Sequence, residues 1–149
     1  MTTIAVDHNG MACDLQMTYG GSVKMKTSTK VIQLVGQHCV DLFECDKALI
    51  GFSGNASQWA SVVGWFTDPT QKPPRLKDLE LLMLTSKKKI FHSNVLTEWV
   101  GLTDKHFSIG SGCAYALAAL ECGKSPKEAV LIASKRDCFT GMGVKEYFL

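Results

Sequence analysis

A threonine at the second position is the first residue of this chain that could do chemistry. The sequence begins Met1-Thr2-Thr3, and aminopeptidases readily remove a methionine that precedes a residue as small as threonine. A threonine hydroxyl is a poor nucleophile unless a base takes its proton. An N-terminal Thr2 would supply that base as its own α-amine, whose ordinary pKa is about 7.7–8.0. Most chains that begin Met-Thr use the threonine for nothing, so this start alone predicts no activity.

Further polar residues follow in a recognisable order. The first third combines a Thr-Thr-Ile start, an aspartate, a Thr-Tyr-Gly turn and a lysine before an apolar run, at Met1–Val6, Asp14, Thr18–Gly20 and Thr29–Val31. This order resembles the opening of HslV and of the proteasome β subunits. The interval from Asp14 to Lys30 equals the interval in that family.

The resemblance implies a role for three of these residues. Thr2 would be the nucleophile, Lys30 the cation that lowers the proton affinity of its hydroxyl, and Asp14 the group that orients Lys30. A buried pair is physically reasonable, because a lone buried ammonium would lose its proton and a carboxylate keeps it charged. The alternative is an ordinary aspartate and lysine on surface strands.

A glycine segment between a predicted strand and a predicted helix is the second block. Gly51–Asn55 resembles the Gly-Phe-Ala-Gly-Gly segment of the family, and the resemblance implies that the Gly54 N–H forms the oxyanion hole. Backbone groups at Thr18 and near Phe52 are expected to bind substrate as an added strand. Glycine between a strand and a helix is also ordinary turn chemistry.

Two blocks near the C-terminus complete the resemblance. Ile109–Ala116 is close to the Ile-Gly-Ser-Gly-Gly-x-Tyr-Ala segment of the family, which implies that Ser111 lies near the N-terminal amine and relays protons. Lys135–Gly141 resembles the proteasomal Arg-Asp-x-x-Thr/Ser-Gly turn, which implies that Asp137 supports Ser111 and that amine. The alternative for Arg136 and Asp137 is a charge pair at a helix C-terminus. Four blocks in one order indicate more than any single motif.

The resemblance also implies a fold and an assembly. The expected fold is the N-terminal-nucleophile hydrolase fold, an α+β architecture with two antiparallel sheets in a four-layer αββα sandwich. Subunits of the family form closed rings, so the expected partners are further copies of this chain, an AAA+ ATPase unfoldase and unfolded polypeptide. The chain is longer than HslV between Lys30 and Gly51, which predicts an extra hairpin around Gln37–Cys45. It is shorter between Gly54 and Ser111, which predicts a missing or reduced outer helix.

Size and composition agree with this interpretation. With 149 residues the chain is expected to form one domain over residues 1–149. A net charge of +2 does not favour nucleic acid or membrane as a partner. Without an apolar leader or spanning segment the expected location is cytoplasmic, where the six scattered cysteines would mostly be small core residues. His38, Cys39 and Cys45 lack familiar metal-ligand spacing, so neither a metal nor a cofactor is expected.

The residue pattern predicts strands first and helices later, as in an α+β fold. Expected strands are 3–6, 11–17, 31–35, 39–43, 48–52, 79–85, 90–92, 106–109 and 144–148, with 96–102 ambiguous. One helix should begin after Asn55 and place Trp59, Val62, Val63 and Phe66 on one face. Two more are expected over residues 112–122 and, after the Ser125-Pro126-Lys127-Glu128 cap, to about residue 138.

Three functions fit these patterns. The first is a threonine endopeptidase that acts after removal of Met1 through an acyl-enzyme ester on Thr2. The second is a catalytically silent ring or virion-associated subunit, which a retained Met1 would favour because the amine would then not lie on Thr2. The third is a small-amide hydrolase on the same fold, since a fold does not determine a substrate.

Overall fold

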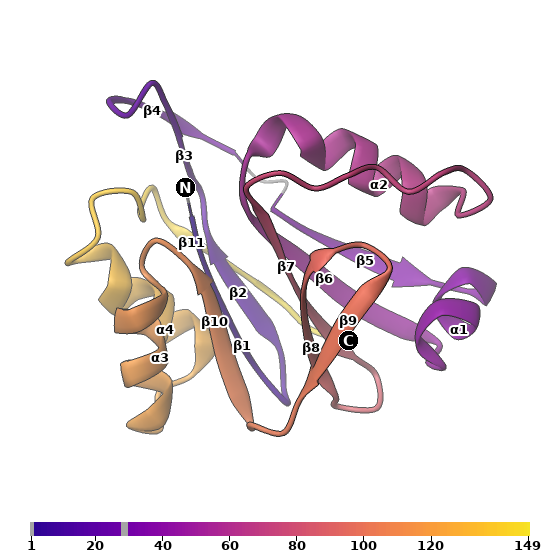
Figure 1. The fold of residues 1–149 in the computed structure, drawn as a ribbon. Helices are drawn as coiled ribbons and strands as arrows, with labels where there is room; N and C mark the ends of the chain where they lie inside the picture. The colour runs from indigo at the N-terminus through magenta and orange to yellow at the C-terminus, as the bar shows by residue number, and fades with distance from the viewer. Residues whose placement is uncertain (1, 28–29) are drawn as a thin grey trace.

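Two antiparallel sheets form the body of the protein (Figure 1). The structure is a computed structural model that describes residues 2–27 and 30–149, so Met1 lies outside the described residues. One sheet consists of β1 (Thr3–Asp7), β2 (Met11–Asp14), β10 (His106–Gly110) and β11 (Val144–Tyr147), in the order β10-β1-β2-β11. The other consists of β5 (Val31–Val35), β6 (Lys47–Gly54), β7 (Leu79–Thr85), β8 (Ile90–Val95) and β9 (Glu98–Leu102), in sequence order.

The strand β1 is buried on both of its faces. Ile4 and Val6 join an apolar cluster that also contains Leu49 and Leu82 of the other sheet, so the two sheets face each other. Ala5, which points to the opposite side, packs among residues of two helices. This double burial explains why the predicted strand is an apolar run rather than an alternating pattern.

Helices α3 (Cys113–Glu121) and α4 (Pro126–Ser134) cover the outer face of the first sheet (Figure 1). Small side chains at the contact, such as Ala116 and Ala129, let the helices approach the sheet closely. The predicted cap of α4 is confirmed, since Ser125 and Glu128 form a reciprocal capping box. The helix ends at Ser134, earlier than the predicted end near residue 138. In the turn that follows, Asp137 accepts the N–H of Phe139 at 3.2 Å.

Helix α2 (Trp59–Thr67) packs on the second sheet after a short 3-10 turn, η1 (Ala56–Gln58). Asn55 caps η1 by accepting the N–H of Ser57, and the side chain of Gln58 accepts the N–H of Lys77 at 2.8 Å. Trp59 and Phe66 lie on the face of α2 that packs on this sheet, so neither is available for contacts between subunits. Both are buried in the core, where Trp59 stacks on Phe52 with ring centroids 4.2 Å apart.

The hairpin predicted around Gln37–Cys45, and the strand within it, are wrong, because this segment forms helix α1 (Gln37–Phe43). Helical spacing places Cys39 and Phe43 together against the core while Asp41 stays exposed. A strand would have pointed Asp41 to the same side as those two apolar residues. The Sγ atoms of Cys39 and Cys45 lie 3.4 Å apart as free thiols.

The strand predicted over residues 11–17 is two strands separated at Leu15. After the break, β3 (Gln16–Tyr19) pairs with β4 (Val23–Lys26) in a separate hairpin whose turn contains Gly20 and Gly21 at positive φ. Leu15 donates its N–H to the carbonyl of Gly141 at 3.1 Å and accepts from Thr27 at 2.8 Å. The chain therefore leaves the first sheet directly after Asp14.

Helices that could cross a membrane are absent from the described part of the chain. Cys13, Cys39 and Cys45 are buried as predicted for core cysteines, but Cys122 and Cys138 are exposed. Within residues 2–27 and 30–149, His, Cys, Asp and Glu side chains form no group of three that could hold a metal ion.

Candidate active site

Thr2, Asp14 and Lys30 meet at one end of the space between the sheets. Thr2 precedes β1, Asp14 ends β2 and Lys30 precedes β5, so three separate segments contribute one side chain each. All three are almost fully buried, with exposed fractions of 3%, 0% and 3%. The Thr2 hydroxyl donates to Asp14 and accepts from the ammonium of Lys30. The structure thus brings together the three residues that the opening motif singles out.

Asp14 accepts hydrogen bonds at both of its carboxyl oxygens. Its Oδ1 accepts from the Thr3 N–H at 3.0 Å and from Lys30 Nζ at 2.8 Å, in addition to the Thr2 hydroxyl. Its Oδ2 accepts the N–H groups of Gln16 at 3.1 Å and Gly141 at 3.0 Å. A buried carboxyl group surrounded by donors in this way is fixed in a single orientation.

Lys30 is enclosed by oxygen acceptors. Its ammonium donates to the Thr2 hydroxyl, to Asp14 and to the backbone carbonyl of Gln16. Burial lowers the pKa of Lys30, while the charge and hydrogen bond of Asp14 act in the opposite direction. A cation that has lost its hydration shell and touches the Thr2 oxygen stabilises negative charge on that oxygen more strongly than an exposed lysine would.

Ser111 and Asp137 form a second hydrogen-bonded pair beside Thr2. Ser111 donates its N–H to the Thr2 carbonyl at 2.9 Å and its hydroxyl to Asp137 at 2.6 Å. Burial would raise the pKa of Asp137, but hydrogen bonds from Ser111 and Thr140 outweigh it and lower the pKa. Asp137 therefore stays ionised next to the N-terminal segment. Arg136 forms no ion pair with it, so the alternative of a helix-terminal charge pair is not what the described residues form.

Thr3 and Thr140 belong to the same network, although no role was predicted for either. Their hydroxyl oxygens lie 2.5 Å apart, Thr3 Oγ1 accepts the Gly112 N–H at 3.0 Å, and Thr140 donates to Asp137 at 2.5 Å. Both residues occur in quoted motifs, the Thr-Thr-Ile start and the Thr-Gly turn. The repeated hydroxyl in those motifs was the only signal that could have identified them.

A cavity of about 230 Å³ opens beside the Thr2 hydroxyl. Its wall combines the polar groups of Thr2 and Lys30 with large apolar side chains, namely Met17, Phe52 and Trp59, and with Thr27, Gly54 and Ala56. An apolar cavity next to a nucleophile and a cation can hold an apolar side chain of a substrate whose reacting group lies at the rim.

Gly54 lies at this cavity and has a backbone conformation that favours glycine. Its φ is 115°, and a methyl group in place of its hydrogen would lie 2.0 Å from the carbonyl oxygen of Asp78. Along β6, the Phe52 N–H points to the carbonyl of Lys30, and the Asn55 N–H points to the opposite side, to Asp78. The alternation of a strand then directs the Gly54 N–H to the side of Lys30.

The two predicted substrate-binding positions lie near the cavity in different ways. Phe52 lines the cavity, while its N–H is already donated to the backbone carbonyl of Lys30 at 3.1 Å. Thr18 is half-buried in β3, where its hydroxyl accepts from the Gln16 side chain at 3.1 Å. Its backbone lies opposite Lys24 in the pairing of β3 with β4.

Comparison with known proteins agrees with this fold. No protein-family model and no curated protein matches the sequence. Among solved structures, HslV from Trypanosoma brucei superposes with a TM-score of 0.69 at 18% identity over 97% of each chain. The Anbu (Gly-1) mutant from Hyphomicrobium sp. strain MC1 gives a TM-score of 0.76 at 10% identity over 100% of this chain and 81% of the other.

A third structure is Thiobacillus denitrificans BPH in complex with epoxomicin. It gives a TM-score of 0.64 at 16% identity and covers 99% of this chain and 97% of that chain. The three superpositions cover this chain almost from end to end, although the identities are low. The chain therefore has the HslV-like fold that the resemblance in its sequence predicts.

Proposed function

We propose that this chain is an N-terminal threonine endopeptidase that acts after removal of Met1. The observation that carries the proposal is the buried Thr2 hydroxyl, which lies between the Lys30 ammonium and the Asp14 carboxylate at the wall of an apolar cavity. A threonine placed only for stability would need neither a buried cation at its oxygen nor a cavity beside it.

The proposed reaction proceeds through an ester on Thr2. The Thr2 oxygen attacks the substrate carbonyl carbon while the α-amine of Thr2, freed by loss of Met1, accepts the hydroxyl proton. The Gly54 N–H stabilises the oxyanion, and Lys30 stabilises charge on the attacking oxygen. The C–N bond then breaks, and the α-ammonium returns its proton to the leaving amine. Water hydrolyses the ester with the same amine as the base.

Ser111 and Asp137 act as positioning residues in this proposal. The Ser111 N–H holds the carbonyl of Thr2, and Asp137 orients the Ser111 hydroxyl close to the same residue. A negative charge at Asp137 favours the protonated state of the nearby amine after it has accepted the hydroxyl proton. The hydroxyl of Ser111 supplies a path for that proton.

The cavity predicts a preference for substrates. Its wall of Met17, Phe52 and Trp59 favours an apolar side chain, and a volume of about 230 Å³ accommodates one of leucine or phenylalanine size. We therefore expect cleavage after such residues in an unfolded polypeptide.

The assembly is part of the proposal. As a single domain over residues 1–149 with a four-layer αββα arrangement, the chain would form a cytoplasmic homo-oligomer served by an AAA+ ATPase. Support comes from the β3–β4 hairpin, where Tyr19, Val23 and Met25 expose apolar surface, with 73% of Tyr19 accessible. Such a surface is typical of a contact between subunits.

Two measurements on untagged protein test the function. The intact mass should correspond to a chain without Met1, and fluorogenic peptides with a leucine before the scissile bond should be cleaved. Thr2→Ala and Lys30→Ala should abolish cleavage, whereas Thr67→Ala, which removes an exposed threonine of α2, should not. A mass that retains methionine, together with no cleavage, would favour the silent subunit. Turnover of small amides alone would favour the amide hydrolase.

A further inference from the structure

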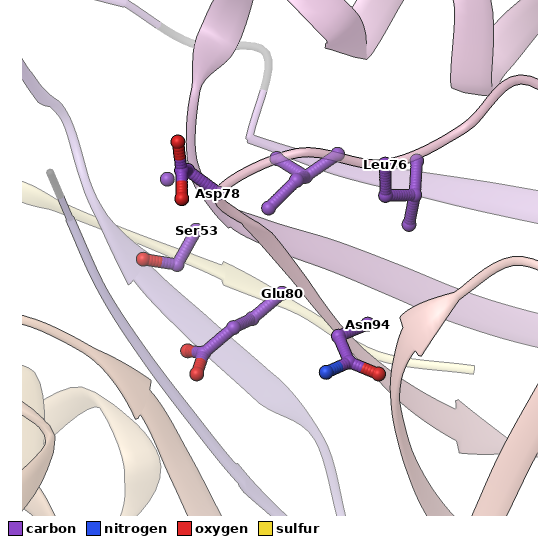
Figure 2. A pocket seen from close by; sticks show the side chains of 7 residues that line it. Ser53, Leu76, Asp78, Glu80 and Asn94 are labelled. Atoms are coloured by element: carbon purple, nitrogen blue, oxygen red, sulfur yellow. The ribbon is translucent and has the colours of Figure 1, made fainter.

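A second cavity adjoins the Thr2 cavity, with Gly54 in the walls of both. Its volume is about 420 Å³, and its wall consists of Ser53, Gly54, Leu76, Asp78, Leu79, Glu80 and Asn94. Figure 2 shows the oxygen atoms of Ser53, Asp78 and Glu80 turned to the same side of this space. A peptide whose carbonyl reached the Gly54 N–H would therefore pass both cavities.

The polar wall of the second cavity is acidic. Asp78 and Glu80 are exposed side chains at the start of β7, and neither forms an ion pair with another described residue. Asp78 directly precedes β7 with φ 55°, Glu80 lies within β7, and both side chains line the same cavity. Two unpaired carboxylates on one side of a concavity attract a cation.

Ser53 supplies an independent sign of a ligand. Only 4% of this residue is exposed, it lines the cavity, and its hydroxyl has no hydrogen-bond partner among residues 2–27 and 30–149. A methyl group on Gly110 would lie 2.7 Å from the Ser53 hydroxyl oxygen and 1.9 Å from the Thr2 carbonyl oxygen, so Ser53 borders the nucleophile. The Ser53 hydroxyl therefore opens to the cavity with its donor and its acceptor free for a molecule bound there.

An organic cation fits this space better than a metal ion. The volume is many times that of one ion, and the described part of the chain contains no group of three His, Cys, Asp or Glu residues arranged for a metal. The apolar side chains of Leu76 and Leu79 can contact the methylene groups of a lysine or arginine while the carboxylates receive its charge.

We propose that this acidic cavity is a subsite for a basic side chain of the substrate, close to the residue held in the Thr2 cavity. The inference rests on the proposed function, because the occupant is part of the same peptide. Asp78 and Glu80 attract the charge, and the Ser53 hydroxyl accepts a hydrogen bond from the ammonium or guanidinium group.

Binding to an inactive protein tests the subsite without depending on turnover. Labelled peptides with a central leucine carry either lysine or uncharged norleucine at each neighbouring position in turn. Their affinity for Thr2→Ala protein is measured by fluorescence anisotropy. At one position the lysine peptide should bind about tenfold more tightly, as expected for two partly exposed ion pairs, and the difference should shrink at high salt.

Variants identify the residues responsible. Asp78→Asn with Glu80→Gln, in the Thr2→Ala protein, should abolish the preference for lysine and leave binding of the norleucine peptides unchanged. Ser53→Ala should weaken binding of the lysine peptide about threefold. Glu44→Gln is the matched control. Glu44 is an exposed residue that follows α1, and its φ of 54° is close to the φ of 55° at Asp78. This control should retain the full preference.

The outcomes distinguish failure of the proposed subsite from failure of the proposed peptidase function. Equal affinity for lysine and norleucine at every position, or no binding of any peptide, would overturn the subsite. A preference for lysine that survives loss of both carboxylates would also overturn it. Processed wild-type protein is assayed in parallel for cleavage. A carboxylate-dependent preference without any cleavage would support the subsite and refute the peptidase, whereas cleavage without a preference would refute only the subsite.

Discussion

Replacing Asp14 with asparagine is expected to destabilise the fold more than replacing Lys30 with methionine. Asp14 is fully buried and accepts from three groups at Oδ1 and from two N–H groups at Oδ2. An asparagine amide in either orientation turns its own N–H groups toward donors and leaves the Lys30 charge without a counterion. Removal of one partner of a buried pair costs about 3–5 kcal/mol, and we expect a loss in that range.

The Lys30→Met variant leaves Asp14 with its other donors. The four remaining groups are the Thr2 hydroxyl and the N–H groups of Thr3, Gln16 and Gly141. Methionine occupies the space of the lysine stem, so the expected cost is only about 1–2 kcal/mol. In the double variant no charge is stranded, so the double loss should be smaller than the sum of the single losses by about 2 kcal/mol.

Urea unfolding followed by tryptophan fluorescence measures all four proteins of this cycle. The slope of each transition shows whether the variants unfold as the wild type does. An Asp14→Asn protein within about 1 kcal/mol of the wild type would refute the reasoning, because the buried cation would then not depend on this carboxylate. Additive losses in the double variant would refute the pairing itself. The order should be reversed for peptidase activity, which Lys30→Met should lower more than Asp14→Asn.

Three further predictions follow from the site and its supports. As the pH rises, the kcat/KM of the processed enzyme should decline before the pH reaches the ordinary lysine pKa of 10.5, because burial lowers the Lys30 pKa and deprotonation removes the required charge. A decline that begins only at or above 10.5 would contradict this. Gly54→Ala should abolish cleavage and lower the free energy of unfolding in urea by about 2 kcal/mol or more, because Gly54 has φ 115° and an added methyl group would collide with the carbonyl of Asp78. Gly64→Ala in α2, where the space around the residue is open, should be neutral or stabilising. Ser125→Ala should lower the free energy of unfolding by about 1 kcal/mol through loss of the α4 cap without changing kcat; an unchanged melting temperature would refute the role of that cap.

The sequence predicts elements well where local chemistry and tertiary packing agree. The cap at Ser125 with Glu128 is such a case, because its hydrogen bonds join residues three apart and need no other part of the chain. The run from Cys39 to Phe43 is the opposite case. The whole helix α1, Gln37–Phe43, has only 7 residues, too few to show a helical or strand period, and only contact of Cys39 and Phe43 with the core decides between them.

Some residues of the candidate site can be identified from the sequence and others cannot. Resemblance identified Thr2, Asp14 and Lys30 because their types and order recur in a family. Gln16 could not be found in that way, since it contributes a carbonyl to Lys30 and an N–H to Asp14, and any residue has those groups. The second cavity was equally hidden from the sequence, because Ser53 and Glu80 come together only through the pairing of β6 with β7.

Thr2 and Thr3 are held so completely that the proposed removal of Met1 need not rearrange the site. The Thr2 carbonyl is fixed by the Ser111 N–H, and the Thr3 N–H is fixed by Asp14. The Thr3 hydroxyl is bonded to Gly112 and Thr140, which lie on separate segments. These bonds all involve atoms on the C-terminal side of the Thr2 amine, so they persist whether or not Met1 precedes it. Removal of one residue would thus create the base at a nucleophile whose position, cation and oxyanion donor are already in place.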